Sequence, residues 1–207
     1  MRKLGSSFML RKAVLVLGIL VACRGQNQAS TQNFQSFSHV ADALAEVASA
    51  LKVSVGFEAG ANDSDNGPVK LDIADKNVVG ILNDIVQQCP AYEWSFEDGV
   101  YDVYPKDQRS SLSNVTVRQF AIRNVTPNDA SQTLSSLPEV RNWLSEHGLT
   151  RQEFYTGPRW KSHERISLEL DNVQIRRILN NLMAKVGNTQ WTIVRYGDKK
   201  EYIGIYF

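Results

Sequence analysis

Two stretches of the chain resemble each other closely: ILNDIVQQCPAYEWSF, from Ile81 to Phe96, and ILNNLMAKVGNTQWTI, from Ile178 to Ile193. They align without a gap inside a longer match, residues 71–97 against 168–194. In each stretch apolar residues recur three and four positions apart, and a tryptophan follows them. This pattern predicts an amphipathic helix and then a strand, both packed in a core. The predicted core residues are Ile81, Leu82, Ile85 and Trp94 in the first copy, and Ile178, Leu179, Leu182 and Trp191 in the second.

The residues around the first stretch extend the pattern. Residues 40–51 have helical spacing, and residues 53–57 and 69–73 alternate as strands do. Asp98-Gly99 marks the turn of a hairpin. The same order returns in the second half of the chain, with an additional helix predicted from Pro138. We therefore expect an α+β fold of two tandem small domains, in which two helices pack on small β-sheets as βαβ-type halves.

The expected organisation follows from these elements and from composition. Polar segments without periodicity separate the periodic ones and predict a tether and a linker. The predicted parts are a signal peptide at 1–22, a tether at 23–33, a first domain at 34–106, a linker at 107–116, and a second, divergent domain at 117–207 with an insertion at 138–165.

The first residues have the layout of an export signal. Basic residues come first, and AVLVLGILVA, residues 13–22, forms a short apolar run. Ten helical residues rise only about 15 Å, too little to span a bilayer. The run ends in LVAC, residues 20–23, which resembles the bacterial lipobox and implies that Cys23 is lipidated. Because Arg24 is not the aspartate that retains such lipoproteins at the inner membrane, the resemblance implies the periplasmic face of the outer membrane. The alternative is an ordinary signal peptide, with Cys23 incidental.

Charge divides the rest of the chain in two. Residues 24–107 carry five basic and thirteen acidic residues, whereas residues 108–207 carry fourteen and nine. A nucleic-acid binder would show one connected basic face, so this division argues against that class. It predicts instead that the halves attract each other, either within one chain or between the copies of a homo-oligomer. Accidental drift between two solvated surfaces is the alternative.

Residues with catalytic or metal-binding chemistry are scattered. His39, His147 and His163 have no spacing with each other or with cysteine that suits a metal. The loop NDSDNG, residues 62–67, lacks the terminal carboxylates of a calcium loop, and no nucleophile or phosphate-binding motif occurs. Cys89 falls on the apolar face of a predicted helix, where cysteine is usually a small buried hydrophobe. We therefore predict no catalytic residue, no metal site and no cofactor.

One segment combines the residue types that are enriched at protein interfaces. EFYTGPRWKSHER, residues 153–165, lies in the predicted insertion and mixes aromatic with basic side chains. The alternative is that its aromatic side chains fold back over the second domain. The candidate partner-binding residues are Tyr155, Arg159, Trp160, Lys161, His163 and Arg165.

The first copy resembles the short N-terminal domain of secretins and TonB-dependent receptors, often abbreviated STN. The resemblance rests on ADALAEVASALKVSVGFE, VKLDIADKNVVGILNDIV, EWSF and YDVYP, and in the second copy it holds from Leu168 onward. It implies an α+β sandwich that makes protein–protein contacts and is not an enzyme. Together with the lipobox it implies a lipid-anchored adaptor that binds another envelope protein, in a secretin-like or TonB-dependent system. A periplasmic module that binds or senses a peptide or glycan between the charged halves is the alternative.

Overall fold

Helices packed on small sheets make up the fold, as the sequence predicts. The computed structural model describes residues 35–60, 68–73, 77–107, 111–151, 165–187, 189–196 and 202–206. The predicted signal peptide and tether lie outside these ranges. The described part contains five α-helices and ten strands, which confirms the α+β class. Residues from Gln32 to Phe207 form one compact unit.

The first half of this unit follows the predicted order of elements. The helix α1 ends at a lysine in the left-handed conformation, and α2 begins at Asn77, whose side chain accepts the Gly80 N–H. Asp98 and Gly99 both have positive φ in the turn between the last two strands. The elements are β1 (Gln35–Phe37), α1 (Val40–Leu51), β2 (Ser54–Glu58), β3 (Val69–Leu71), α2 (Val78–Gln88), β4 (Tyr92–Glu97) and β5 (Val100–Pro105).

The second half repeats this order with one extra helix. Thr126 and Asp129 form a capping box at the start of α3, and α5 ends at Gly187, which has positive φ. The two-residue strand β7 is not predicted by the sequence. The elements are β6 (Thr116–Val125), α3 (Pro127–Ser136), α4 (Pro138–Glu146), β7 (Thr150–Arg151), β8 (Ile166–Gln174), α5 (Ile175–Val186), β9 (Gln190–Tyr196) and β10 (Tyr202–Tyr206).

Strand pairing repeats between the halves. In the first half β1 pairs with β3 in antiparallel fashion, and three strands form a sheet in the order β4-β5-β2. In the second half β6 pairs with β8, and three strands form a sheet in the order β9-β10-β7. Each half therefore has one two-stranded and one three-stranded sheet of the same topology.

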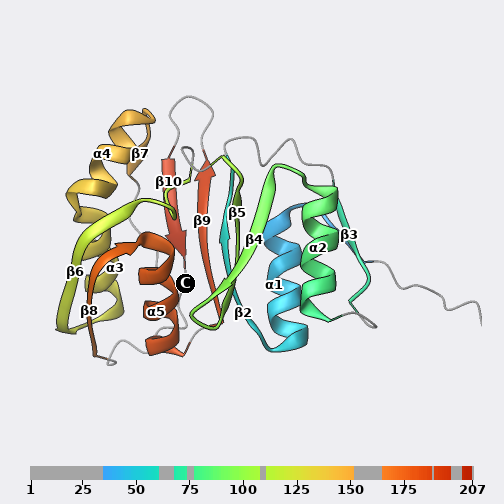
Figure 1. Ribbon diagram of the computed structural model, residues 1–207, viewed down its shortest axis with the longest axis horizontal. Helices are drawn as coiled ribbons and strands as arrows, with labels where there is room; N and C mark the ends of the chain where they lie inside the picture. The colour runs from blue at the N-terminus through green and yellow to red at the C-terminus, as the bar shows by residue number, and fades with distance from the viewer. Residues whose placement is uncertain are drawn as a thin grey trace, which may run out of the picture. The chain divides into compact units, whose positions relative to one another are not determined.

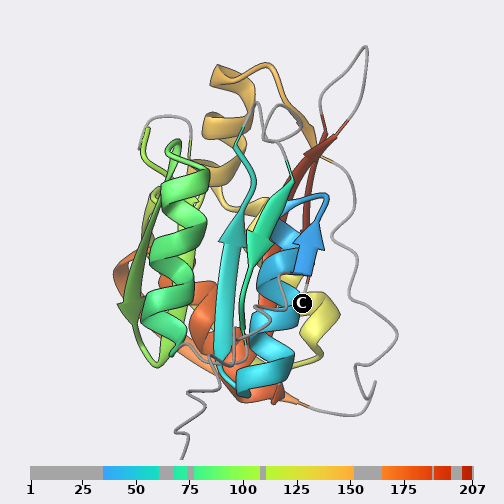
Figure 2. The same ribbon diagram turned by 90° about the vertical axis from the view of Figure 1, so that its right-hand side faces the viewer.

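The two three-stranded sheets join into one sheet of six strands, because β2 pairs with β9 in parallel. In the repeat β9 corresponds to β4, but the two run in opposite directions. The three strands of the second half keep the order of the first three but run in the opposite direction. The face of the sheet that the helices cover in the first half therefore corresponds to the opposite face in the second half. The helices α1 and α2 accordingly lie on one side of the sheet and α3, α4 and α5 on the other (Figure 1). Figure 2 looks at the unit from the side of α1 and α2.

The shared sheet differs from the expectation that each domain would keep its own sheets. Residues 53–57 alternate as a strand with one buried face would, yet β2 is buried on both faces. Its central place in the sheet, between β5 and β9, is the physical reason.

Buried apolar residues form two clusters, one within the first half and one that consists mainly of second-half residues and also includes Val100 of β5. Seven of the predicted core residues are at most 1% exposed: Ile81, Leu82, Ile85, Ile178, Leu179, Leu182 and Trp191. The eighth, Trp94, packs against the core of the first half but stays partly exposed. Cys89 is buried, as expected for a small hydrophobe.

Candidate functional site

An asparagine and a tryptophan form the same hydrogen bond in each copy of the repeat. In the first copy Trp94 Nε1 on β4 donates to Asn83 Oδ1 on α2, at 3.0 Å. In the second copy Trp191 Nε1 on β9 donates to Asn180 Oδ1 on α5, at 2.6 Å. Each bond holds the strand against the preceding helix. The pair in the second copy is buried and the pair in the first copy is exposed.

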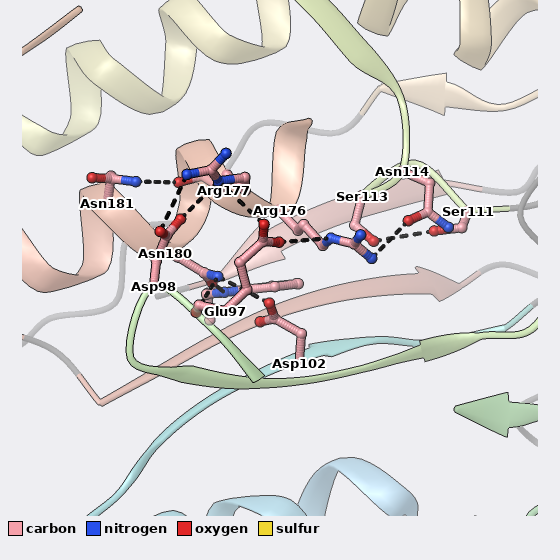
Figure 3. Close-up of polar contacts among 11 residues, drawn as sticks. Glu97, Asp98, Asp102, Ser111, Ser113, Asn114, Arg176, Arg177, Asn180 and Asn181 are labelled. Carbon is pink, nitrogen blue, oxygen red and sulfur yellow. Dashed lines mark hydrogen bonds and ion pairs between the residues drawn. The ribbon is translucent and has the colours of Figure 1, made fainter. Parts of the chain in front are cut away.

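The buried pair lies where β9 meets β2. Gly56 of β2 stands opposite Trp191 of β9 on one side and opposite Asp102 of β5 on the other. A Cβ atom at Gly56 would overlap the indole ring of Trp191 and Oδ1 of Asp102. Across this glycine, Asn180 Nδ2 donates to Asp102 Oδ2 at 2.9 Å (Figure 3). The glycine therefore lets a second-half asparagine reach a first-half carboxyl group.

We call the contact between the halves along the paired strands β2 and β9 the joint. Asp102 of β5 is a buried acid at this joint. Burial raises its pKa from 3.8 to about 7, against the opposing effects of the Asn180 hydrogen bond and the Arg176 charge. The nearby charges of Glu97 and Asp98 also raise it. Within the described residues, Asp102 Oδ1 has no hydrogen-bond partner. An unpaired oxygen disfavours the ionised form, in agreement with the direction of the shift.

Ion pairs connect the acidic half to the basic half within the chain. The guanidinium of Arg177 on α5 pairs with Asp98 at 2.9 Å and with Glu97 at 3.4 Å, and Asp98 raises the pKa of Arg177. Arg176 pairs with Glu97 at 3.4 Å (Figure 3). Its guanidinium also lies over the ring of Tyr104. These ion pairs lie at the boundary between the two halves.

The predicted linker is part of the joint. Glu58 of β2 is buried and accepts hydrogen bonds from Ser111 Oγ at 2.6 Å, Leu112 N at 2.6 Å and Ser113 N at 3.0 Å. Burial raises the pKa of Glu58, although these hydrogen bonds act in the opposite direction. Ser113 O in turn accepts the backbone N–H of Arg176 in the first turn of α5. The linker consequently ties β2 to a helix of the second half.

The edge of the six-stranded sheet at β4 exposes aromatic side chains. Phe96 is 58% exposed, and its ring centroid lies 4.5 Å from that of Tyr101 on β5. Trp94 extends the group, with its ring 6.2 Å from that of Tyr101. In the second copy Ile193 takes the place of Phe96, and it is fully buried where β9 meets β2. Among the residues that the structure describes, the same surface is therefore covered in the second copy and open in the first.

The residues predicted to bind a partner lie mostly in the insertion, outside the described part of the chain. Tyr155, Arg159, Trp160, Lys161 and His163 lie outside the described residues, as does Cys23. Arg165 is described and exposed, just before β8. The pKa of Asp129 lies below its usual value because Thr126 donates hydrogen bonds to it, and the charge of Arg165 adds to this effect.

The described residues place the remaining candidates in structural roles. His147 caps α4, where Nδ1 lies 2.8 Å from the Trp143 carbonyl oxygen and the two rings stack. No cluster of potential metal ligands occurs in the described part of the chain. In the same part, no helix has the length and apolar character needed to span a membrane.

Comparison with known proteins adds no relative. No family model matches the sequence, and no curated protein or solved structure matches it significantly. The resemblance to the secretin and TonB domain therefore stays a prediction.

Three features of the site escaped sequence reasoning. The first is the hydrogen bond between asparagine and tryptophan in each copy. Asn83 and Asn180 are matched in the repeat, and in each copy a tryptophan follows eleven positions later, which was the available signal of this bond. Gly56 carried no signal, because its close neighbour is a strand 135 residues away in sequence. The exposure of Phe96 was equally hidden, because periodicity does not tell an edge strand from a central one.

Proposed function

We propose that this protein is a lipid-anchored adaptor of the bacterial envelope, which binds another envelope protein through the open edge of β4. The aromatic group at this edge, with Phe96 exposed and Trp94 and Tyr101 partly exposed, is the observation that carries the proposal. An edge strand offers unpaired backbone groups, and soluble proteins usually protect such edges with charge, proline or a covering segment. An edge lined with aromatic side chains fits a recognition surface.

The other parts of the proposal come from the sequence. The basic start, the apolar run and LVAC at residues 20–23 support export and lipidation at Cys23. The likeness to the secretin and TonB domain supports a partner in a secretin-like or TonB-dependent system. The absence of recognised catalytic motifs from the sequence is in keeping with an adaptor.

Photo-crosslinking in cells tests this function. A photoreactive phenylalanine analogue replaces Phe96 in the full-length chain, and a matched chain carries it at Glu169, which is exposed on β8. We expect a discrete crosslinked species from position 96 that is absent from position 169, with the partner identified by mass spectrometry. Equal, diffuse labelling from both positions would contradict the proposal.

A further inference from the structure

We infer that the open edge of β4 accepts a parallel strand that carries glycine opposite Trp94, in the way that β9 accepts β2 inside the chain. The inference rests on the proposed function and specifies the chemistry of the partner. Its source is the internal joint, where one copy of the repeat already shows how this kind of edge is covered.

The joint defines what such an edge requires. β2 and β9 run parallel with Gly56 opposite Trp191, and backbone hydrogen bonds of 2.8 Å join Val55 N to Thr189 O and Ala59 N to Ile193 O. The indole ring occupies the space where a Cβ at Gly56 would lie. Any residue other than glycine at this place would have to displace a buried ring that is hydrogen-bonded to Asn180.

β4 presents the same features on its free side. Like β9, it follows a helix, bonds its tryptophan to a helix asparagine, and pairs on one side with an antiparallel strand. Its other side corresponds to the side of β9 that receives β2. Because Trp94 and Phe96 correspond to the buried Trp191 and Ile193, a strand added here would cover both of them.

The asparagine adds a second requirement. At the joint, Asn180 Nδ2 reaches across the glycine to a carboxyl group one strand further on, at Asp102. Asn83 is held in the same orientation, because its Oδ1 accepts the Trp94 indole N–H. A partner would therefore offer glycine on its edge strand and a hydrogen-bond acceptor on the strand behind it.

The partner is a different protein and not a second copy. In this chain the glycine strand β2 already lies between β5 and β9, so a second copy cannot offer β2 without unfolding its own joint. The other described strand with a glycine is β10, which carries Gly204 and lies between β9 and β7. The other end of the six-stranded sheet is β7, which has only two residues, Thr150–Arg151. A folded partner domain with an available edge strand meets the requirement.

Peptide titration followed by NMR tests the glycine requirement. The probe is a capped peptide with the sequence VSVGFEA, residues 53–59, with lysines added for solubility, and the matched control has valine in place of its glycine. The 15N-labelled chain lacking residues 1–23 receives each peptide, and the indole N–H signal of Trp94 is assigned with the Trp94→Phe variant. We expect a saturable shift of this signal, with binding at least tenfold weaker for the valine peptide.

Several results would overturn the inference. They are equal binding of the two peptides, absence of binding by either peptide, or a shift of the Trp191 signal without the Trp94 signal, which would mean that the peptide enters the joint instead. The crosslink from Phe96 separates these failures from those of the proposed function. If the crosslink captures a partner but the two peptides bind equally, the proposed adaptor function is supported and the inferred pairing with a glycine strand is wrong. Capture of a second copy of this chain would remove the claim that the partner is a different protein.

Discussion

Gly56 is the residue on which the joint between the halves depends. Its hydrogen atoms face the indole of Trp191 and Oδ1 of Asp102, both buried, and neither neighbour is a flexible chain end that could move aside. The interior of a protein is packed densely enough that one added methyl group is felt. The contact also lies next to the Asn180 bridge between the halves, so a shift here disturbs polar as well as apolar contacts.

We predict that Gly56→Ala lowers the free energy of unfolding by about 2 kcal/mol or more, because the new methyl group overlaps the Trp191 ring. The matched control is Gly60→Ala, whose added Cβ would lie 3.4 Å from the nearest atom, Tyr92 Oη. This control should change the stability by less than about 1 kcal/mol. Urea unfolding followed by fluorescence measures both, and equal stabilities would contradict the packing described for Gly56.

Asp102 should make the stability of the fold depend on pH. Burial raises its pKa to about 7, so the folded protein keeps a proton that the unfolded chain releases near pH 4. The free energy of unfolding therefore falls as the pH rises from about 4 to about 7 and levels off above that. Between pH 5 and pH 8 the titration of Asp102 should lower the free energy of unfolding by about 3 kcal/mol.

The Asp102→Asn variant provides the comparison for this prediction. It has no proton to release at this position, and it keeps an oxygen that can accept from Asn180 Nδ2. Glu58 and the other acids are present in both proteins, so their contributions cancel in the difference. The stability of the wild type relative to the variant should fall with pH across this window. A difference that stays constant from pH 5 to pH 8 would show that Asp102 is ionised throughout.

At the level of elements, the same helix–strand contact occurs in two environments. The contact between α5 and β9 is buried by β2, whereas the contact between α2 and β4 remains at the free edge. When a hydrogen bond to an exposed group is lost, water can take the place of the missing partner. A buried acceptor that loses its donor has no water to replace it and stays unpaired. The two matched tryptophans should therefore differ in their contribution to stability.

We predict that Trp191→Phe destabilises the protein by about 3 kcal/mol, since it opens space in the core and leaves Asn180 Oδ1 without its donor. Trp94→Phe should cost less than about 1 kcal/mol, because water can reach Asn83. Chemical denaturation of both variants under one condition gives the comparison. Similar losses would show that β4 is covered to the same extent as β9.

At the scale of the whole molecule, the halves share more than a covalent connection. They share the parallel pair β2–β9, the Glu58 contacts with the linker, and the ion pairs of Arg176 and Arg177. Salt screens the attraction between charged side chains but does not remove backbone pairing or burial. The attraction between acidic and basic residues is therefore only one of the interactions that hold the halves together.

We predict that the two halves unfold together in one cooperative transition. Calorimetry of the chain lacking residues 1–23 should give a single peak, with a calorimetric enthalpy equal to the van't Hoff enthalpy. Each half alone would expose one edge of the β2–β9 pair, which favours the joined state. Two resolved peaks would indicate that the halves are stable without the joint.

The parts of the fold that the sequence predicts are those with a local signal. The spacing of Ile81, Leu82 and Ile85 and its recurrence at Ile178 are set by the period of one helix, so the helices and their buried faces could be predicted. The contact of Gly56 with Trp191 joins strands far apart in sequence and leaves no periodic trace.

The candidate site was harder to predict than the fold. Ser111 and Ser113 have the composition of a solvated linker, yet both are buried because Glu58 needs their donors. Polar composition alone does not separate a solvated segment from one that donates hydrogen bonds to a buried carboxyl group. The aromatic edge escaped prediction for a related reason, since Trp94 and Trp191 stand at matching positions of the repeat and the pattern does not show which of them another strand covers.

The asparagine and the tryptophan that bond in each copy stand eleven positions apart, from the middle of a helix to the following strand. We call this pair, an asparagine on a helix and a tryptophan eleven positions later, a fingerprint of the module. It can be searched for in other sequences in which overall identity is too low to detect a duplicated module. Each occurrence on an apolar helix would count one module, and a glycine strand elsewhere in the chain would show whether that module is closed internally. In this chain Gly56 of β2 lies against the fingerprint of the second copy, whereas no described strand pairs with β4 on the side away from β5, beside the fingerprint of the first copy.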